Sequence, residues 1–172
     1  MRMSLKLKAI AVILLFTVIL SVSIVFISYN TYTDSFRRHY SSLALSISKS
    51  TASVVDAKKV KAVAEEVQKT YRTFCEKNGG VPSDLSDSEA EDYYAEFEYI
   101  TDMPEYKELL EVLTKLREDN EAESLYLGYT DVATMKDLYL VDASALEPCR
   151  PGVFDDVQPE HVAKIEKGDY EF

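Results

Sequence analysis

An uninterrupted apolar segment near the N-terminus limits what this chain can fold into. Ala9–Tyr29 contains 21 residues and no charge, proline or glycine. As an α-helix it would measure about 31 Å, which matches a hydrocarbon core of about 30 Å. A buried core helix of this length normally carries a polar stripe, and the few hydroxyl residues here are too scattered to form one. The segment therefore predicts a membrane-spanning helix.

The competing interpretation of this segment is a cleaved signal peptide. Signal peptides have an apolar stretch of about 7–15 residues followed by a small-x-small cleavage site. The stretch in this chain is longer, and the residues that follow it, SYNTYTDSF, contain no such site. A retained anchor is therefore the favoured interpretation.

Flanking charges indicate the orientation of the anchor. Arg2, Lys6 and Lys8 lie on its short N-terminal side, whereas Arg37 and Arg38 lie farther from its other end. Because positive charge favours the cytoplasmic side, residues 1–8 are predicted to be cytoplasmic and residues 30–172 to form an extracytoplasmic domain at the plasma membrane.

The charge of the remaining chain excludes one class of partner. The net charge of −11 includes +3 from residues 1–8, so residues 9–172 carry −14. An acidic domain of this kind repels the phosphates of nucleic acids, and nucleic-acid binding is not expected. Most of this acidity is explained by solubility alone.

The segment that follows the membrane is predicted to continue as one helix, Asn30–Val55. Its apolar side chains recur at helical spacings, and no proline or glycine interrupts them. They are Phe36, Tyr40, Leu43, Ile47 and Val54. Such a face serves equally well for a homodimer through residues 30–55 or for packing within the domain.

Three further helices are predicted from their caps. Asp56 is a suitable N-cap for a helix over Ala57–Lys77, which Asn78-Gly79-Gly80 would end. Ser86-Asp-Ser-Glu89 reads as a capping box that opens a short acidic helix to about Ile100. Asp102-Met-Pro-Glu105 reads as another, before a helix over Tyr106–Arg117.

The C-terminal third has the composition of a small sheet. Ser124–Tyr129 and Asp137–Asp142 are predicted to form two antiparallel strands, followed by a rigid loop over Leu146–Phe154 and a short helix over Gln158–Lys167. Two strands are too few for a stable sheet. The fold class expected is therefore α+β, with a domain incomplete on its C-terminal side.

No catalytic motif is visible in the sequence. It has no glycine-rich phosphate loop, no HExxH and no nucleophile elbow, and its two histidines, His39 and His161, read as surface residues. Acidic pairs such as Asp155-Asp156 lack the spacing of a calcium loop. We expect no catalytic residue, metal or cofactor. Cys75 and Cys149 permit one disulfide, and free thiols are the alternative.

Three residues on the predicted strands are candidates for binding a small molecule. Tyr126 and Tyr139 with Asp142 could enclose a cation or amine through ring faces and a charge-assisted hydrogen bond. Ordinary sheet packing, with Asp142 ending its strand, is the alternative. In a regular strand Asp142 points away from Tyr139, so the three residues meet only if the strand bends or ends.

The order of these features is similar to that of a known family. The basic start, the membrane helix, the long outward helix and then SLYLGY…DLYLVDA…EPCRPG resemble the N-terminal portion of Cache-type sensor domains in bacterial transmembrane receptors, notably those of clostridial-type bacteria. The resemblance implies a PAS-like sheet that binds a small molecule outside the cell. This chain departs from the family by ending where later strands should begin and by an apparent insertion over residues 81–99.

Two functions are compatible with these features. One is a sensory input domain that signals to a cytoplasmic output outside this chain; in the resembled family that output is a diguanylate cyclase, histidine kinase, PP2C-type phosphatase or chemotaxis module. The other is a stand-alone, membrane-tethered interaction or scaffold protein. Neither makes this chain itself an enzyme.

Overall fold

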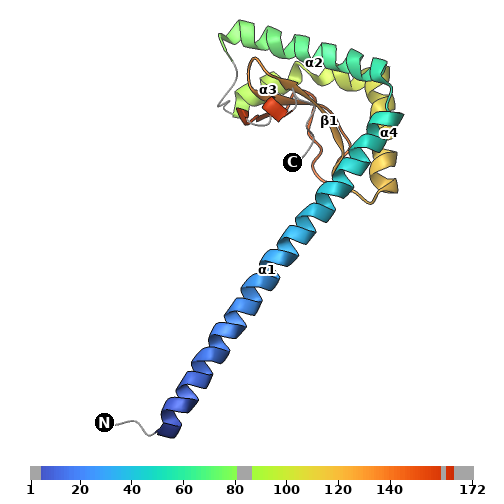
Figure 1. The fold of residues 1–172 in the computed structure, drawn as a ribbon. Helices are drawn as coiled ribbons and strands as arrows, with labels where there is room; N and C mark the ends of the chain where they lie inside the picture. Colours follow the sequence, from blue (N-terminus) through green and yellow to red (C-terminus); the bar gives the residue numbers. More distant parts are fainter. Residues whose placement is uncertain (1–4, 81–86, 160–161, 165–172) are drawn as a thin grey trace. The chain divides into compact units, whose positions relative to one another are not determined.

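A computed structural model describes residues 5–80, 87–159 and 162–164 of the protein (Figure 1). Four α-helices, a 3₁₀ helix and a three-stranded antiparallel sheet are present among these residues, which confirms the α+β class. In chain order they are α1 (Leu5–Val54), α2 (Ala57–Asn78), α3 (Asp87–Ala95), η1 (Glu98–Asp102), α4 (Pro104–Asp119), β1 (Tyr126–Asp131), β2 (Lys136–Asp142) and β3 (Phe154–Asp156).

The first compact unit of the chain is α1 up to Ser46. Within the described chain, α1 is the one helix whose length and composition suffice to cross a membrane. Its large apolar side chains from Ile10 to Ile27 are each half or more exposed to the surroundings. Exposure of so much apolar surface to water is unfavourable. The hydrocarbon core of a membrane is an environment in which this segment is stable.

The helix continues without a break beyond the apolar segment, as predicted, and ends at Val54. Phe36, Tyr40 and Leu43, which belong to its predicted apolar face, are about half exposed. The homodimer through this face stays a prediction.

The second unit begins at Ile47 and includes all the remaining elements. Its helix α2 agrees with the predicted bounds to within one residue at its end. Asp56 Oδ1 accepts a hydrogen bond from the Lys58 N–H at 2.8 Å, and Gly79 adopts the left-handed conformation with φ 74°. Local capping chemistry therefore defines both ends of this helix.

The helices that follow differ from the prediction in their caps. The acidic helix ends at Ala95 and is followed by η1, and the proposed cap at Ser86 lies outside the described residues. The predicted capping box at Asp102 is wrong. Pro104 occupies the first turn of α4 and holds Met103 in the extended conformation of an N-cap, while Asp102 pairs with Lys107 at 2.9 Å.

The sheet has the order β1-β2-β3, with a hairpin between β1 and β2. The sequence did not predict β3, because three residues are too few to show an alternating pattern and its first residue fell within the expected loop. Of the predicted helix over Gln158–Lys167, residue 159 and residues 162–164 are helical and lie in the described part. Both cysteines are free thiols.

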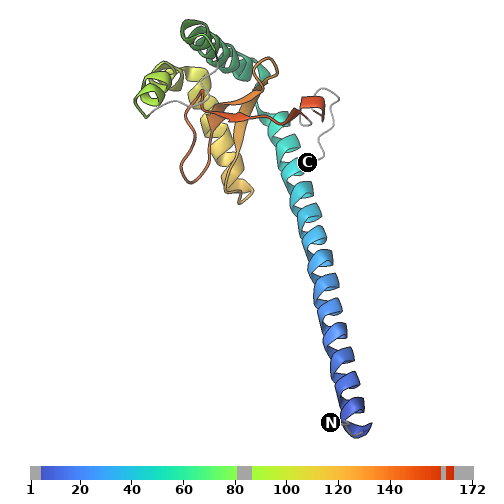
Figure 2. The same ribbon diagram turned by 90° about the vertical axis from the view of Figure 1, so that its left-hand side faces the viewer.

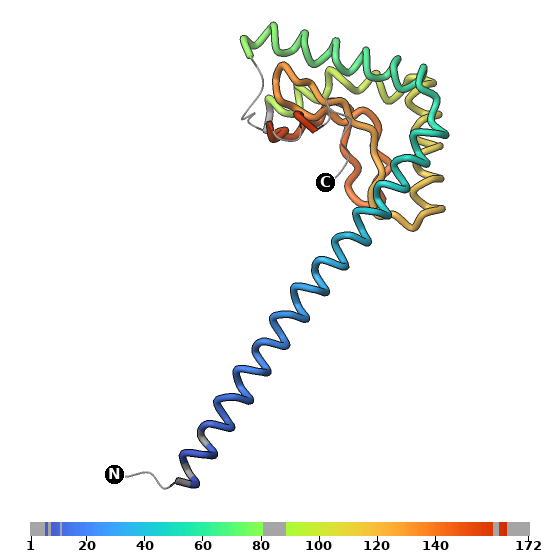
Figure 3. Tube along the Cα trace, viewed as in Figure 1, coloured from blue at the N-terminus to red at the C-terminus, as the bar shows by residue number. Residues whose placement is uncertain are grey.

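One hydrophobic core joins α2, α4 and the sheet. α2 and α4 contact each other and β2, and η1 contacts both helices (Figures 2 and 3). The fully buried side chains include Val63, Val67 and Tyr71 of α2, Leu109 and Leu113 of α4, and Leu138 of β2. The helices thus cover one face of the sheet, and the other face carries the candidate site.

Candidate functional site

An extra residue in β2 determines which side chains share the outer face of the sheet. Leu127 lies opposite Val141, and Gly128 lies opposite Tyr139, so Leu140 forms a β-bulge. Tyr126 lies opposite Asp142. Because opposed residues point to the same face, the bulge places Asp142 on the face of Tyr126 and Tyr139. This is the departure from regular geometry that the candidate site requires.

The two tyrosines are in direct contact. The ring centroids of Tyr126 and Tyr139 are 4.8 Å apart, with the ring planes inclined by 37°. The Tyr126 side chain is about half exposed, and the Tyr139 hydroxyl donates a hydrogen bond to Asp155 Oδ2 at 3.2 Å. Tyr129, by contrast, lies opposite Leu138 and packs against the core. The outer face therefore presents an aromatic pair next to a carboxylate.

Asp142 holds the loop that follows β2. Its side chain is buried, and Oδ1 accepts hydrogen bonds from the Ser144 N–H at 2.8 Å and the Ser144 hydroxyl at 2.5 Å. Oδ2 accepts from the Cys149 N–H at 2.8 Å. The carboxylate therefore fixes the start of the loop after β2, and the alternative interpretation of Asp142 as the residue that ends its strand agrees with this geometry.

Two aspartates that were not among the candidate binding residues complete the outer face. Asp137 lies opposite both Thr130 and Asp155 in the sheet, and its Oδ1 accepts from the Thr130 hydroxyl at 3.1 Å. Burial raises the pKa of Asp137, the Thr130 hydrogen bond lowers it, and the nearby charge of Asp155 raises it further. Only the position of β3 reveals that Asp155 belongs here, which is why the spacing of residues along the chain did not show it.

The carboxylates also affect the neighbouring hydroxyl and thiol groups. Burial raises the pKa values of Tyr126 and Tyr139, and Asp155 adds to both shifts. Burial likewise raises the pKa of the Cys149 thiol, and the charges of Asp142 and Asp155 reinforce it. The tyrosines and the cysteine are therefore neutral at physiological pH, and Cys149 is a poor nucleophile.

The arrangement provides groups that can bind a positively charged molecule. Two ring faces and two carboxylates, of which Asp137 is partly buried and Asp155 is exposed, attract a cation or an amine. In the ranges 5–80, 87–159 and 162–164, no group of three or more His, Cys, Asp or Glu side chains is placed to hold a metal ion.

No family model matches this chain, and no curated protein or solved structure is similar to it. The functional argument therefore rests on the residues themselves.

Proposed function

We propose that this chain is a membrane-anchored sensory input domain that binds a small amine on the outer face of its sheet. The proposed site is formed by Tyr126, Tyr139, Asp137 and Asp155, with Asp142 in support. In this proposal the N-terminus is cytoplasmic, the domain is extracytoplasmic, and the signal passes to an output that the chain does not contain. The resemblance of the sequence to Cache-type sensor domains supports the same assignment.

The observation that carries the proposal is the contact between Tyr139 and Asp155. An aromatic ring pair and a carboxylate meet on the sheet face that α2 and α4 leave free. A charged amine can pair with the carboxylate while its alkyl part rests against the rings. The neighbouring Asp137 adds a second negative charge, which favours a cation over an anion or a neutral molecule.

Two adjacent aspartates provide a matched test of this site. Asp155 faces the tyrosines, whereas Asp156 lies opposite Lys136 and forms an ion pair with it. The full chain in detergent micelles is titrated with putrescine and with phenethylamine, and binding is measured by calorimetry. Asp155→Asn is expected to weaken binding by about tenfold or more, because a charge-assisted hydrogen bond contributes about 1.5–3 kcal/mol. Asp156→Asn is expected to leave it unchanged.

The result that contradicts the proposal is equally specific. If neither amine binds, or if the two variants bind alike, the outer face is not an amine site. A membrane-tethered scaffold, the second function that the sequence allows, would then be the better assignment.

The orientation has its own test. A Cys75→Ser variant leaves Cys149 as the single thiol, and a membrane-impermeant maleimide is applied to intact cells at pH 8.5, because the raised pKa of Cys149 slows its reaction at neutral pH. Labelling in intact cells is expected. Labelling that occurs only after lysis would reverse the orientation.

A further inference from the structure

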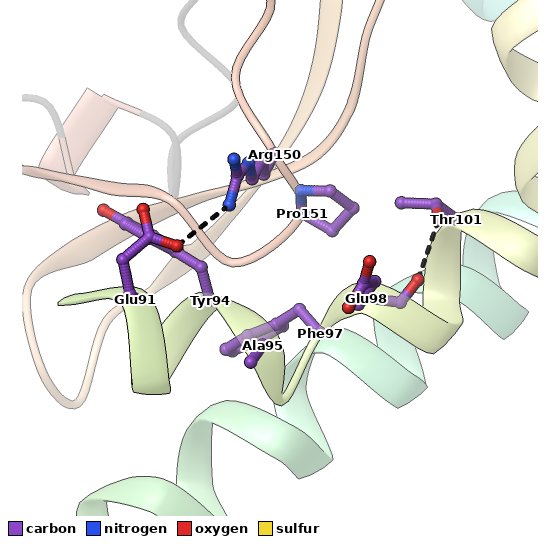
Figure 4. A pocket seen from close by; sticks show the side chains of 8 residues that line it. All are labelled: Glu91, Tyr94, Ala95, Phe97, Glu98, Thr101, Arg150 and Pro151. Carbon is purple, nitrogen blue, oxygen red and sulfur yellow. Dashed lines mark hydrogen bonds and ion pairs between the residues drawn. The ribbon is translucent and has the colours of Figure 1, made fainter. Parts of the chain in front are cut away.

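A second concave region lies away from the sheet face, between α3, η1 and the loop that precedes β3. It is a hollow of about 470 Å³, within the size range of small-molecule sites (Figure 4). Its lining residues are Glu91, Tyr94, Ala95, Phe97, Glu98, Thr101, Arg150 and Pro151. None of them belongs to a strand, so this pocket is separate from the outer face described above.

The walls of the pocket are fixed by buried contacts. The Tyr93 hydroxyl donates to the carbonyl oxygen of Gly152 at 2.7 Å, and the Gly152 N–H donates to the Tyr139 carbonyl at 2.9 Å. The Phe97 ring packs against the α-carbon of Gly152, and Pro151 is buried. The loop is therefore held against α3 before any ligand arrives, which lowers the entropic cost of binding.

The positive group of the pocket is available to a ligand. The nearest partner of the Arg150 guanidinium in the described structure is Glu91, with 3.8 Å between Nη1 and Oε2, and the Arg150 side chain is 66% exposed. This separation is too long for a hydrogen bond. The planar donors of Arg150 can therefore bind a carboxylate in a bidentate manner.

The negative group of the pocket, the Glu98 carboxylate, lies on the other side from Arg150 (Figure 4). Thr101 Oγ1 donates to the backbone oxygen of Glu98 at 2.7 Å, and the described residues provide no hydrogen bond or ion pair to the Glu98 carboxylate. Figure 4 shows Arg150 and Glu91 toward one side and Glu98 with Thr101 toward the other, with Pro151, Phe97 and Ala95 between them. Charged ends thus flank a middle that carries no charged side chain.

We propose that this pocket is a second ligand site, selective for a small zwitterion that carries a carboxylate and an ammonium group at separate ends. The carboxylate pairs with Arg150, the ammonium pairs with Glu98, and a short methylene chain lies along Ala95 and Tyr94, the lining residues between them that are exposed or partly exposed. A simple anion would leave the Glu98 carboxylate without a partner. A simple cation would face the arginine. Only a molecule with both charges complements both ends.

Three zwitterions of increasing charge separation test the assignment: glycine, β-alanine and 4-aminobutyrate. Butyrate and butylamine are the matched controls, since each lacks one of the two charges. The full chain in detergent micelles is titrated, and NMR of ¹³C-labelled tyrosine rings reports the location. Tyr94 is expected to shift on binding, while Tyr126 and Tyr139 do not, which separates this site from the proposed amine site.

At least one zwitterion is expected to bind saturably, and the single-charge controls at least tenfold more weakly. Arg150→Gln and Glu98→Gln are each expected to weaken binding about tenfold without changing the melting temperature, because both side chains are at the surface. Arg72→Gln and Glu111→Gln, exposed on α2 and α4, are controls that should bind as the wild type does.

The proposal is overturned by the absence of saturable binding for all three zwitterions, by equal binding of butyrate or butylamine, or by unchanged affinity in Arg150→Gln. If the shifts appear at Tyr126 and Tyr139 instead, the zwitterion binds the sheet face, and the pocket is not its site.

Discussion

Substituting Gly152 by alanine tests how firmly the loop before β3 is held. Gly152 has φ 83°, a backbone conformation that residues with a side chain rarely adopt. A Cβ atom there would also lie within 2.6 Å of ring carbons of Phe97, which is itself fully buried. The substitution therefore combines backbone strain with a steric clash that the core cannot relieve cheaply.

The expected loss in the free energy of unfolding has two parts, one from the backbone strain and one from the steric clash. Placing a residue other than glycine in the left-handed conformation costs about 1–2 kcal/mol, and overpacking a well-packed core costs typically about 1–3 kcal/mol. The free energy of unfolding should therefore fall by roughly 2–5 kcal/mol in Gly152→Ala. Gly79→Ala provides the matched control, because Gly79 has φ 74° and nothing lies within 4 Å of the added Cβ. It should lose only the conformational part.

The measurement is urea unfolding of the full chain in detergent micelles, followed by near-ultraviolet circular dichroism. The protein has 12 tyrosines and no tryptophan, and the three tyrosines of α1 are exposed. The change in this signal on unfolding therefore reports mainly the packing of the buried tyrosines in the second unit. A Gly152→Ala/Phe97→Leu double variant should lose less stability than the two single variants added together.

Equal losses in the two glycine variants would refute the reasoning, because the contact with Phe97 would then contribute nothing. An additive double variant would lead to the same conclusion. Either result would also weaken the claim that the pocket next to this loop is preformed.

Three further predictions follow from other contacts of the domain. Tyr93→Phe should lower the free energy of unfolding by about 1–2 kcal/mol, because it leaves the buried Gly152 carbonyl without its hydrogen bond; calorimetric melting checks this. Asp142→Ala should cost about 2–4 kcal/mol, because three hydrogen bonds to the following loop are lost, and hydrogen exchange at the Ser144 and Cys149 amides should increase. Asp137→Asn should stabilise the protein at neutral pH: burial raises the pKa of this carboxyl in the folded state, so ionisation becomes a cost as pH rises above its unfolded value of about 3.9. Melting temperatures should show the gain at pH 7 and no gain at pH 3.

The parts of the fold that the sequence predicted correctly are those set by local chemistry. The apolar segment from Ala9, the cap at Asp56 and the glycine at position 79 each act on their own neighbourhood, and α1 and α2 followed from them. The wrong prediction of a cap at Asp102 also has a local cause. Pro104 restricts Met103 to the extended conformation, and this restriction outweighs the capping box that Asp102 and Glu105 could form.

The candidate site was harder to predict because it depends on pairing between strands. Tyr126 and Tyr139 were selected from their strands, but the position of Asp142 on their face depends on the bulge at Leu140, and nothing in DLYLVD marks that residue as the extra one. Asp155 joins the site through β3, three residues long. The pocket around Arg150 needs α3 and the loop to meet, although 59 residues separate the Arg150 and Glu91 positions that pair across it.

The bulge in β2 leaves one residue of the hairpin without an opposite residue, and this determines how the hairpin should respond to a change of length. Leu140 has no opposite residue in β1, whereas Tyr139, Val141 and Asp142 lie opposite Gly128, Leu127 and Tyr126. Deleting Leu140 would therefore keep these pairs in a regular ladder, and Asp142 would stay on the outer face. A single-residue deletion should be tolerated here better than in the regular part of the hairpin, where a slip by one residue moves every following side chain to the other face.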